Sequence, residues 1–141
     1  MSISTLAVYD INNYLSSDST LQTIAGKTMS FFPIIGGGDE NAPFVVYIVN
    51  HNIPSVEAWW NRYDSLSYAV YDTNIDRLLR IGERMIEMLS KGDVISESGG
   101  KEGTDVRLFS TSFDGSSLGE AIEKDGWFTM ILDFTVYYVV K

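Results

Sequence analysis

The chain has 141 residues, the length of one ordinary domain, and its 45% hydrophobic and 21% charged residues are close to globular averages, which excludes disorder of the whole chain. Its 10 Lys and Arg against 19 Asp and Glu give a net charge of −9, which disfavours a protein that grips nucleic-acid phosphates. The absence of cysteine excludes disulfides, thiolate nucleophiles and cysteine-based zinc sites.

Neither a membrane anchor nor an export signal is expected. The N-terminus has no basic segment before its apolar residues, and polar residues interrupt them. Every apolar stretch is shorter than the 18 or so residues that a membrane helix needs.

The N-terminal quarter of the chain predicts two helical segments. Apolar residues recur every three or four positions over residues 2–16, which is typical of an amphipathic helix. Ser16, Ser17 and Asp18 then offer a break and a new N-cap, and a short helical turn follows that ends at Gly26.

An extended segment comes next. Residues 28–35 are apolar and aromatic with Pro33 inside, so we expect an edge strand or an extended arm. Three glycines at 36–38 add a joint, and we interpret residues 27–43 as a flexible arm. No Gly-Lys-Ser/Thr follows the glycines, so a phosphate-binding loop is disfavoured.

Two strands and the longest regular helix occupy the centre. Strands are predicted at residues 44–50 and 66–72, joined by a long aromatic loop over 51–65. Residues 74–90 have the 3.6-residue apolar period of a helix, with Asp72 or Thr73 as its cap.

The C-terminal part predicts two more strands. A polar, glycine-rich stretch at 93–103 is expected to be a flexible loop, followed by a strand at 104–113 and a turn or short helix at 114–125. The final strand, 126–140, alternates with period two. One of its faces is wholly apolar, whereas the other is mixed.

This alternation predicts the fold class. A strand that is apolar on one face only belongs to an antiparallel sheet that is covered on one side. We therefore predict a single α+β domain over residues 1–141, with an antiparallel sheet of about four to five strands and two main helices packed on one face.

The residues that could carry catalysis have simpler explanations. His51 is the one histidine and is expected to be an exposed residue at a strand end, since no nucleophile or orienting partner accompanies it. The pairs Glu83 with Glu87 and Asp72 with Asp76 are interpreted as solvated or helix-capping carboxylates. We predict no catalytic residue, no metal site and no cofactor.

Aromatic residues indicate binding surfaces instead. Trp59, Trp60 and Tyr63 lie beside Arg62 in the long loop, where they are either partner anchors or a lid over one end of the domain. The mixed face of the last strand, with Ile131, Tyr137 and Val139, is too apolar for a surface left in water. With Phe31 and Phe32 of the arm, these residues form the predicted subunit or partner interface: Phe31, Phe32, Trp59, Trp60, Tyr63, Ile131, Tyr137 and Val139.

The order of elements resembles a known family. An N-terminal helix ending in LSSDSTLQTIAGK is followed by FFPII, by the strand NAPFVVYIV, by YDTNIDRLLRIGERMIEML and by the closing strand GWFTMILDFTVYYV. This order, over nearly the whole chain, resembles the tail-terminator or tail-completion proteins of tailed bacteriophages. The loop with Trp59 and Trp60 has no clear counterpart in that pattern.

The resemblance implies a virion structural protein of the tail or neck, assembled in the host cytoplasm and not an enzyme. It implies a homo-oligomeric ring, typically of six copies, which caps the tail tube and docks to the head-tail connector. DNA would pass through the lumen without sequence-specific binding, and a net negative wall would repel its phosphates. The alternative is a small-ligand or peptide-binding α+β module that uses the Trp59-Trp60 loop.

Overall fold

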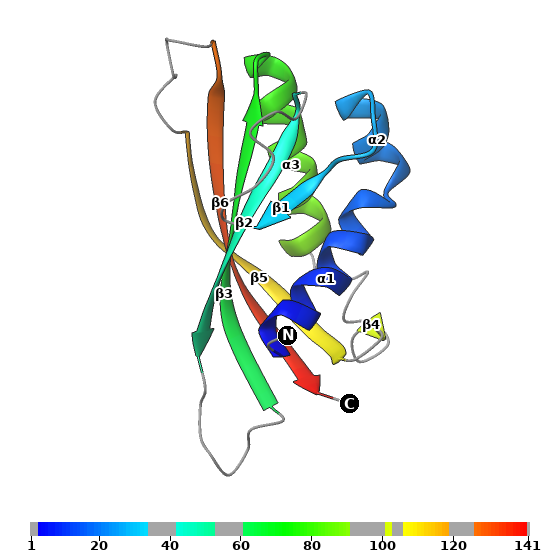
Figure 1. The fold of residues 1–141 in the computed structure, drawn as a ribbon, viewed down its shortest axis with the longest axis vertical. Coiled ribbons are helices and arrows are strands. Elements are labelled where there is room, and N and C mark those ends of the chain that lie inside the picture. The colour runs from blue at the N-terminus through cyan, green and yellow to red at the C-terminus, as the bar shows by residue number, and fades with distance from the viewer. Residues whose placement is uncertain are drawn as a thin grey trace.

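A single sheet of six strands, covered on one side by three helices, forms the molecule (Figure 1). The computed structural model describes the backbone of residues 3–33, 42–52, 61–90, 101–102, 106–118 and 126–140. The elements in chain order are α1 (Ile3–Ser16), α2 (Ser19–Ala25), β1 (Phe31–Pro33), β2 (Phe44–Asn52), β3 (Asn61–Asp72), α3 (Ile75–Ser90), β4 (Lys101–Glu102), β5 (Val106–Leu118) and β6 (Phe128–Val140).

The sheet has the strand order β1-β2-β3-β6-β5-β4, and every pair is antiparallel except β1 with β2, which is parallel. The predicted α+β class, the mostly antiparallel sheet and its one-sided helical cover are confirmed. The two ends of the described strand order are short strands, and the long strands β3 and β6 lie at the centre.

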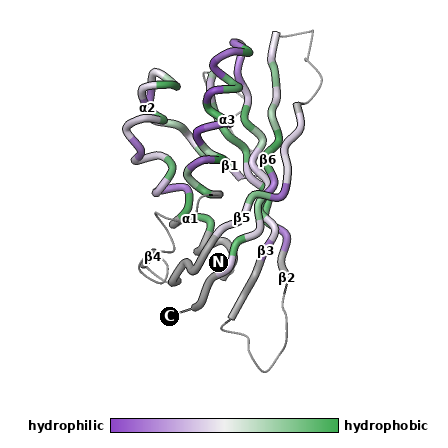
Figure 2. The backbone as a smooth tube through the Cα atoms, turned by 180° about the vertical axis from the view of Figure 1, so that it is seen from behind, coloured by the Kyte–Doolittle hydropathy of each residue, from purple (hydrophilic) through white to green (hydrophobic). Residues whose placement is uncertain are grey.

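The core lies between the helices and one face of the sheet. Along β6 the even-numbered residues from Met130 to Val136 face the helices, and Leu132 and Phe134 have no exposed surface. Tyr68 of β3 packs edge-on against Phe134 with ring centroids 6.2 Å apart. From the helical layer, α1 contributes Ile11 and α3 contributes Met85, both fully buried. Figure 2 shows hydrophobic residues in both layers, as this packing requires.

Three predicted loop or turn boundaries are wrong, and in each case strand pairing extends further than local composition indicates. The predicted loop 51–65 is shorter, because β2 continues to Asn52 and β3 begins at Asn61. Within the predicted turn or helix 114–125, residues 114–118 continue β5 beyond a bulge after Phe113. Residues 101–102, predicted as loop, form β4 and pair with β5.

The helix caps are partly as predicted. Asp18 caps α2, accepting the backbone N–H of Leu21 at 2.8 Å, and Gly26 ends α2 with a left-handed φ of 76°. The cap of α3, however, is Asn74, whose side-chain oxygen accepts the N–H of Arg77 at 3.1 Å. The expected capping residue Asp72 instead receives the Arg77 guanidinium.

An ion pair fastens α2 to α3. The carboxylate of Asp18 accepts two hydrogen bonds from the Arg84 guanidinium, both at 2.9 Å. These bonds, together with the N–H of Leu21, lower the pKa of Asp18 from its ordinary 3.8, although partial burial opposes the shift. One side chain therefore caps a helix and holds it against its neighbour.

A buried hydrogen bond joins α1 to the sheet. The Tyr68 hydroxyl donates to Oδ1 of Asn12 at 2.6 Å, and both residues are buried. Burial raises the pKa of Tyr68 well above its ordinary value, so the hydroxyl keeps its proton and remains a donor. This bond fixes the position of α1 over β3.

We expect Asp18→Asn to lower the free energy of unfolding by about 1 kcal/mol at neutral pH, since asparagine keeps the cap but loses the charged pair with Arg84. Because the folded-state pKa of Asp18 is depressed, the advantage of the wild type is complete above pH 3.8 and is lost as the pH falls through the folded-state pKa. Urea unfolding of both proteins across acid pH measures this. A difference that stays constant with pH would contradict the assignment.

The change Tyr68→Phe should lower the free energy of unfolding by about 1 kcal/mol, because Oδ1 of Asn12 loses its buried partner. Tyr71→Phe is the matched control, since the structure gives the half-buried Tyr71 a ring contact with Phe44 but no hydrogen bond for its hydroxyl. Thermal or urea unfolding of the two variants should differ accordingly. Equal losses would show that the Tyr68–Asn12 bond contributes nothing specific.

Candidate assembly surface

No described helix covers the other side of the sheet (Figure 1), and this side carries exposed apolar residues. Ile48 of β2, Ile131 of β6 and Tyr137 of β6 have exposed fractions of 40%, 36% and 45%, and they are the exposed large hydrophobics within the described residues. Strand alternation places all three on the side opposite the buried Tyr68 and Phe134. We call this side the open face.

An aromatic cluster closes one end of the open face. Phe44 at the start of β2 stacks on Tyr71 of β3 with ring centroids 5.2 Å apart, and Trp127 meets Phe44 edge-on at 5.4 Å. Phe32 of β1 approaches Phe44 at 6.1 Å. Phe44 itself is buried within this cluster, so the aromatic end is pre-formed and rigid.

The middle of the open face is polar. The Ser67 hydroxyl donates to Asp133 across β3 and β6 at 2.6 Å, and the Thr135 hydroxyl donates to Asp114 across β6 and β5 at 2.6 Å. These cross-strand bonds hold two exposed carboxylates beside the apolar Ile48 and Ile131. The open face therefore combines exposed apolar side chains with carboxylates that are held in fixed positions.

The predicted interface residues fall into three groups. Ile131 and Tyr137 lie on the open face, and Phe32 joins its aromatic end. Phe31 does not, because it faces the helix-covered side and meets Tyr68 edge-on with ring centroids 5.7 Å apart. Tyr63 is paired with Tyr137 in the sheet and Val139 with Asn61, but their side chains are outside the description.

The predicted loop anchors Trp59 and Trp60 lie outside the described residues. Phe44, Tyr71 and Trp127 of the aromatic end were missed as surface candidates. These residues come together only through the register of paired strands, which a single sequence does not reveal. The recurrence of aromatic residues at the starts and ends of predicted strands was the available signal for such a cluster.

The carboxylates considered for chemistry have structural roles. Asp72 is fully buried and accepts two hydrogen bonds from Arg77, at 2.7 and 2.6 Å, besides the backbone N–H of Thr73. Glu87 pairs with Arg84 at 2.8 Å, and Glu83 is exposed.

The described part of the chain offers no other class of site that the sequence suggested. It contains no group of three or more His, Cys, Asp or Glu residues that could hold a metal ion. His51, expected beyond a strand end, lies within β2. None of the described helices has both the length and the apolar composition needed to cross a membrane.

Adjacent residues on β6 test the assignment of the two faces. Ile131→Ala should cost about 1 kcal/mol of unfolding free energy, since its side chain is partly in water already. Leu132→Ala should cost about 2–5 kcal/mol, because Leu132 has no exposed surface. Urea unfolding measures both, and similar losses would contradict the one-sided cover.

Comparison with known proteins gives a likeness of fold. No family model matches the chain, and no curated protein matches its sequence. Among 25 matching chains of solved structures is one from the virion of a native gene transfer agent particle, with a TM-score of 0.67 and 12% sequence identity. The match covers 98% of this chain and 98% of that one, so the whole fold described above is shared with a chain of that virion.

Proposed function

We propose that this chain is a structural protein of a phage-like virion, a tail terminator or tail-completion component that forms a ring at the head-tail neck. The observation that carries the proposal is the open face, where Ile48, Ile131 and Tyr137 remain exposed on an otherwise well-packed sheet. A fold likeness over 98% of both chains to a protein from a gene transfer agent virion supports the same class.

The charges on the open face favour one mode of self-association. Two copies packed face to face would bring Asp114 and Asp133 of one copy near the same carboxylates of the other, and like charges brought together oppose association. A contact between the open face and a different surface of the next copy avoids this repulsion. Such head-to-tail contacts generate closed rings when the rotation closes.

The partners follow from the position of such a ring. One side of it would sit on the tail tube and the other would meet the head-tail connector, with DNA passing through the lumen. A net charge of −9 fits a wall past which DNA phosphates slide without binding. The proposal assigns no catalytic residue and no cofactor.

Ring formation is tested on the purified protein at high concentration. Light scattering should give the mass of about six 15.8 kDa chains, and electron microscopy of the same sample should show rings. Ile48→Lys and Ile131→Lys should each leave the chain folded but shift it to monomer, because a lysine at an apolar contact must lose its hydration.

Thr23→Lys is the matched control, because Thr23 is exposed on α2 in the helical layer. It should assemble like the wild type. Loss of rings in this variant alone would move the interface to the helices. A wild-type protein that stays monomeric at millimolar concentration and does not bind tail tubes would overturn the proposal and favour a binding module instead.

A further inference from the structure

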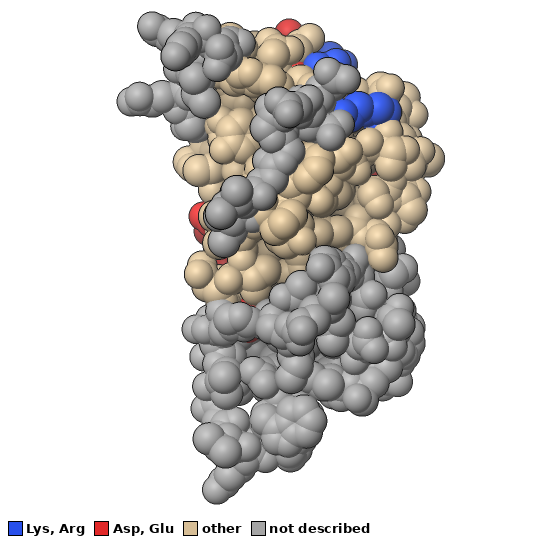
Figure 3. All heavy atoms as spheres, viewed as in Figure 1, with Lys and Arg blue, Asp and Glu red and all other residues tan. Residues whose placement is uncertain are grey.

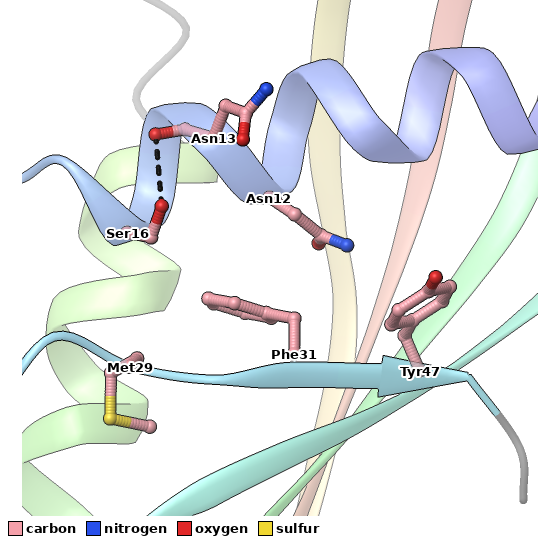
Figure 4. Close-up of a pocket in the computed structure, with 6 residues that line it drawn as sticks. All are labelled: Asn12, Asn13, Ser16, Met29, Phe31 and Tyr47. Carbon is pink, nitrogen blue, oxygen red and sulfur yellow. Dashed lines mark hydrogen bonds between the residues drawn. The ribbon is translucent and has the colours of Figure 1, made fainter. Parts of the chain in front are cut away.

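An open groove of about 390 Å³ lies at the edge of the molecule, between α1 and the strands β1 and β2 (Figure 4). Asn12, Asn13 and Ser16 of α1 form its polar wall, whereas Met29, Phe31 and Tyr47 form an apolar and aromatic wall opposite. The groove lies on the helix-covered side of the sheet, so it is separate from the open face.

Asn12 presents an unused donor to this groove. Its exposed fraction is 9%, and its Oδ1 is occupied by the Tyr68 hydroxyl at 2.6 Å. That bond fixes the orientation of the amide, and Figure 4 shows its Nδ2 turned toward the space between α1 and Tyr47. Among the described residues no group accepts a hydrogen bond from this nitrogen, which keeps some access to solvent. A donor held in a fixed orientation in this way suits a carbonyl oxygen.

The backbone of β1 offers a second set of groups. β1 is an end strand of the sheet, and the carbonyl of Ser30 accepts the N–H of Val45 on β2 at 3.0 Å. Because backbone groups alternate in direction along a strand, the N–H and C=O of Phe31 point away from β2. A strand edge with such groups is a template for an added strand.

The lining also limits what can bind. None of the six described lining residues is charged, so this part of the lining offers no group to neutralise a phosphate or a carboxylate. In the view of Figure 3, which has β1 and α1 toward the viewer, most of the described surface carries neither acidic nor basic side chains. An uncharged ligand with both carbonyl groups and apolar side chains fits this chemistry.

We propose that the groove binds an extended peptide segment of a partner protein. The segment lies along the outer edge of β1, exchanges backbone hydrogen bonds with Phe31 and directs one carbonyl to Nδ2 of Asn12. An apolar side chain of the segment packs against the ring of Phe31. The site does not require ring formation, since it uses none of the open-face residues.

A capped pentapeptide, acetyl-Thr-Val-Thr-Val-Thr-amide, is a suitable probe of this site. Titrated to about 5 mM into the isotope-labelled full chain, it should shift the NMR signals of Asn12, Met29 and Phe31 in a saturable way. The same peptide with N-methylated backbone amides should not bind, because it cannot pair with a strand edge. Both titrations are also run on the Ile131→Lys variant, which is expected to be monomeric, so that the result is independent of assembly.

Asn12→Asp tests the donor directly. Aspartate keeps an oxygen for the Tyr68 hydroxyl but replaces the Nδ2 donor by an acceptor, so peptide affinity should fall about tenfold or more. Asn50→Asp introduces the same charge on an exposed residue of β2 that is not part of the groove lining, and it should reduce affinity much less.

A second pair of variants keeps the proposal testable even if Asn12→Asp does not fold. Ser16→Leu places a larger side chain in the groove and should block the peptide, whereas Ser17→Leu lies outside the lining and should not. The proposal is overturned if the peptide causes no shifts at about 5 mM, if the shifts lie on the open face, or if neither Asn12→Asp nor Ser16→Leu weakens binding.

Discussion

The structure depends on the one-sided burial of its two central strands. Leu66, Tyr68 and Val70 of β3 and Leu132 and Phe134 of β6 are all buried against the helices. The intervening residues necessarily point the other way, because the side-chain period of a strand is two. The three described helices all lie on one side, so no described helix covers the apolar residues of the opposite side (Figure 1). The exposed sheet surface thus follows directly from how the core is built.

Specific polar contacts then orient the helical layer, which apolar packing alone would leave free to slide. The Tyr68–Asn12 hydrogen bond positions α1 over β3, and the Asp18–Arg84 pair positions α2 on α3. The first contact also consumes the oxygen of the Asn12 amide. The same bond that anchors α1 therefore also turns the amide nitrogen of Asn12 toward the groove. One residue thus serves both the packing of α1 and the groove.

The parts of the fold that local sequence patterns determine could be predicted. The helical period gave α1 and α3 nearly to the residue, and the alternation of β6 gave its buried face. The parts set by pairing between distant segments could not. Nothing local indicates that β1 runs parallel to β2, that β5 continues past a bulge at Phe113, or that Arg84 reaches Asp18, which is 66 residues away. The side of the sheet that Phe31 faces could not be predicted for the same reason, since it depends on the register of β1.

The two surfaces suit different kinds of contact. The open face is broad, with aromatic rings already packed at one end and carboxylates fixed by cross-strand hydroxyls, so it presents a rigid surface that another folded chain can match. The groove is narrow and bounded by a strand edge, which suits a single extended segment. Because they lie on opposite sides of the sheet, a contact that covers the open face of one copy does not cover the groove of that copy through the same surface. A chain that joins its own copies through the open face and also holds a neighbouring protein needs such separation, since a partner in the groove then does not compete for the open face.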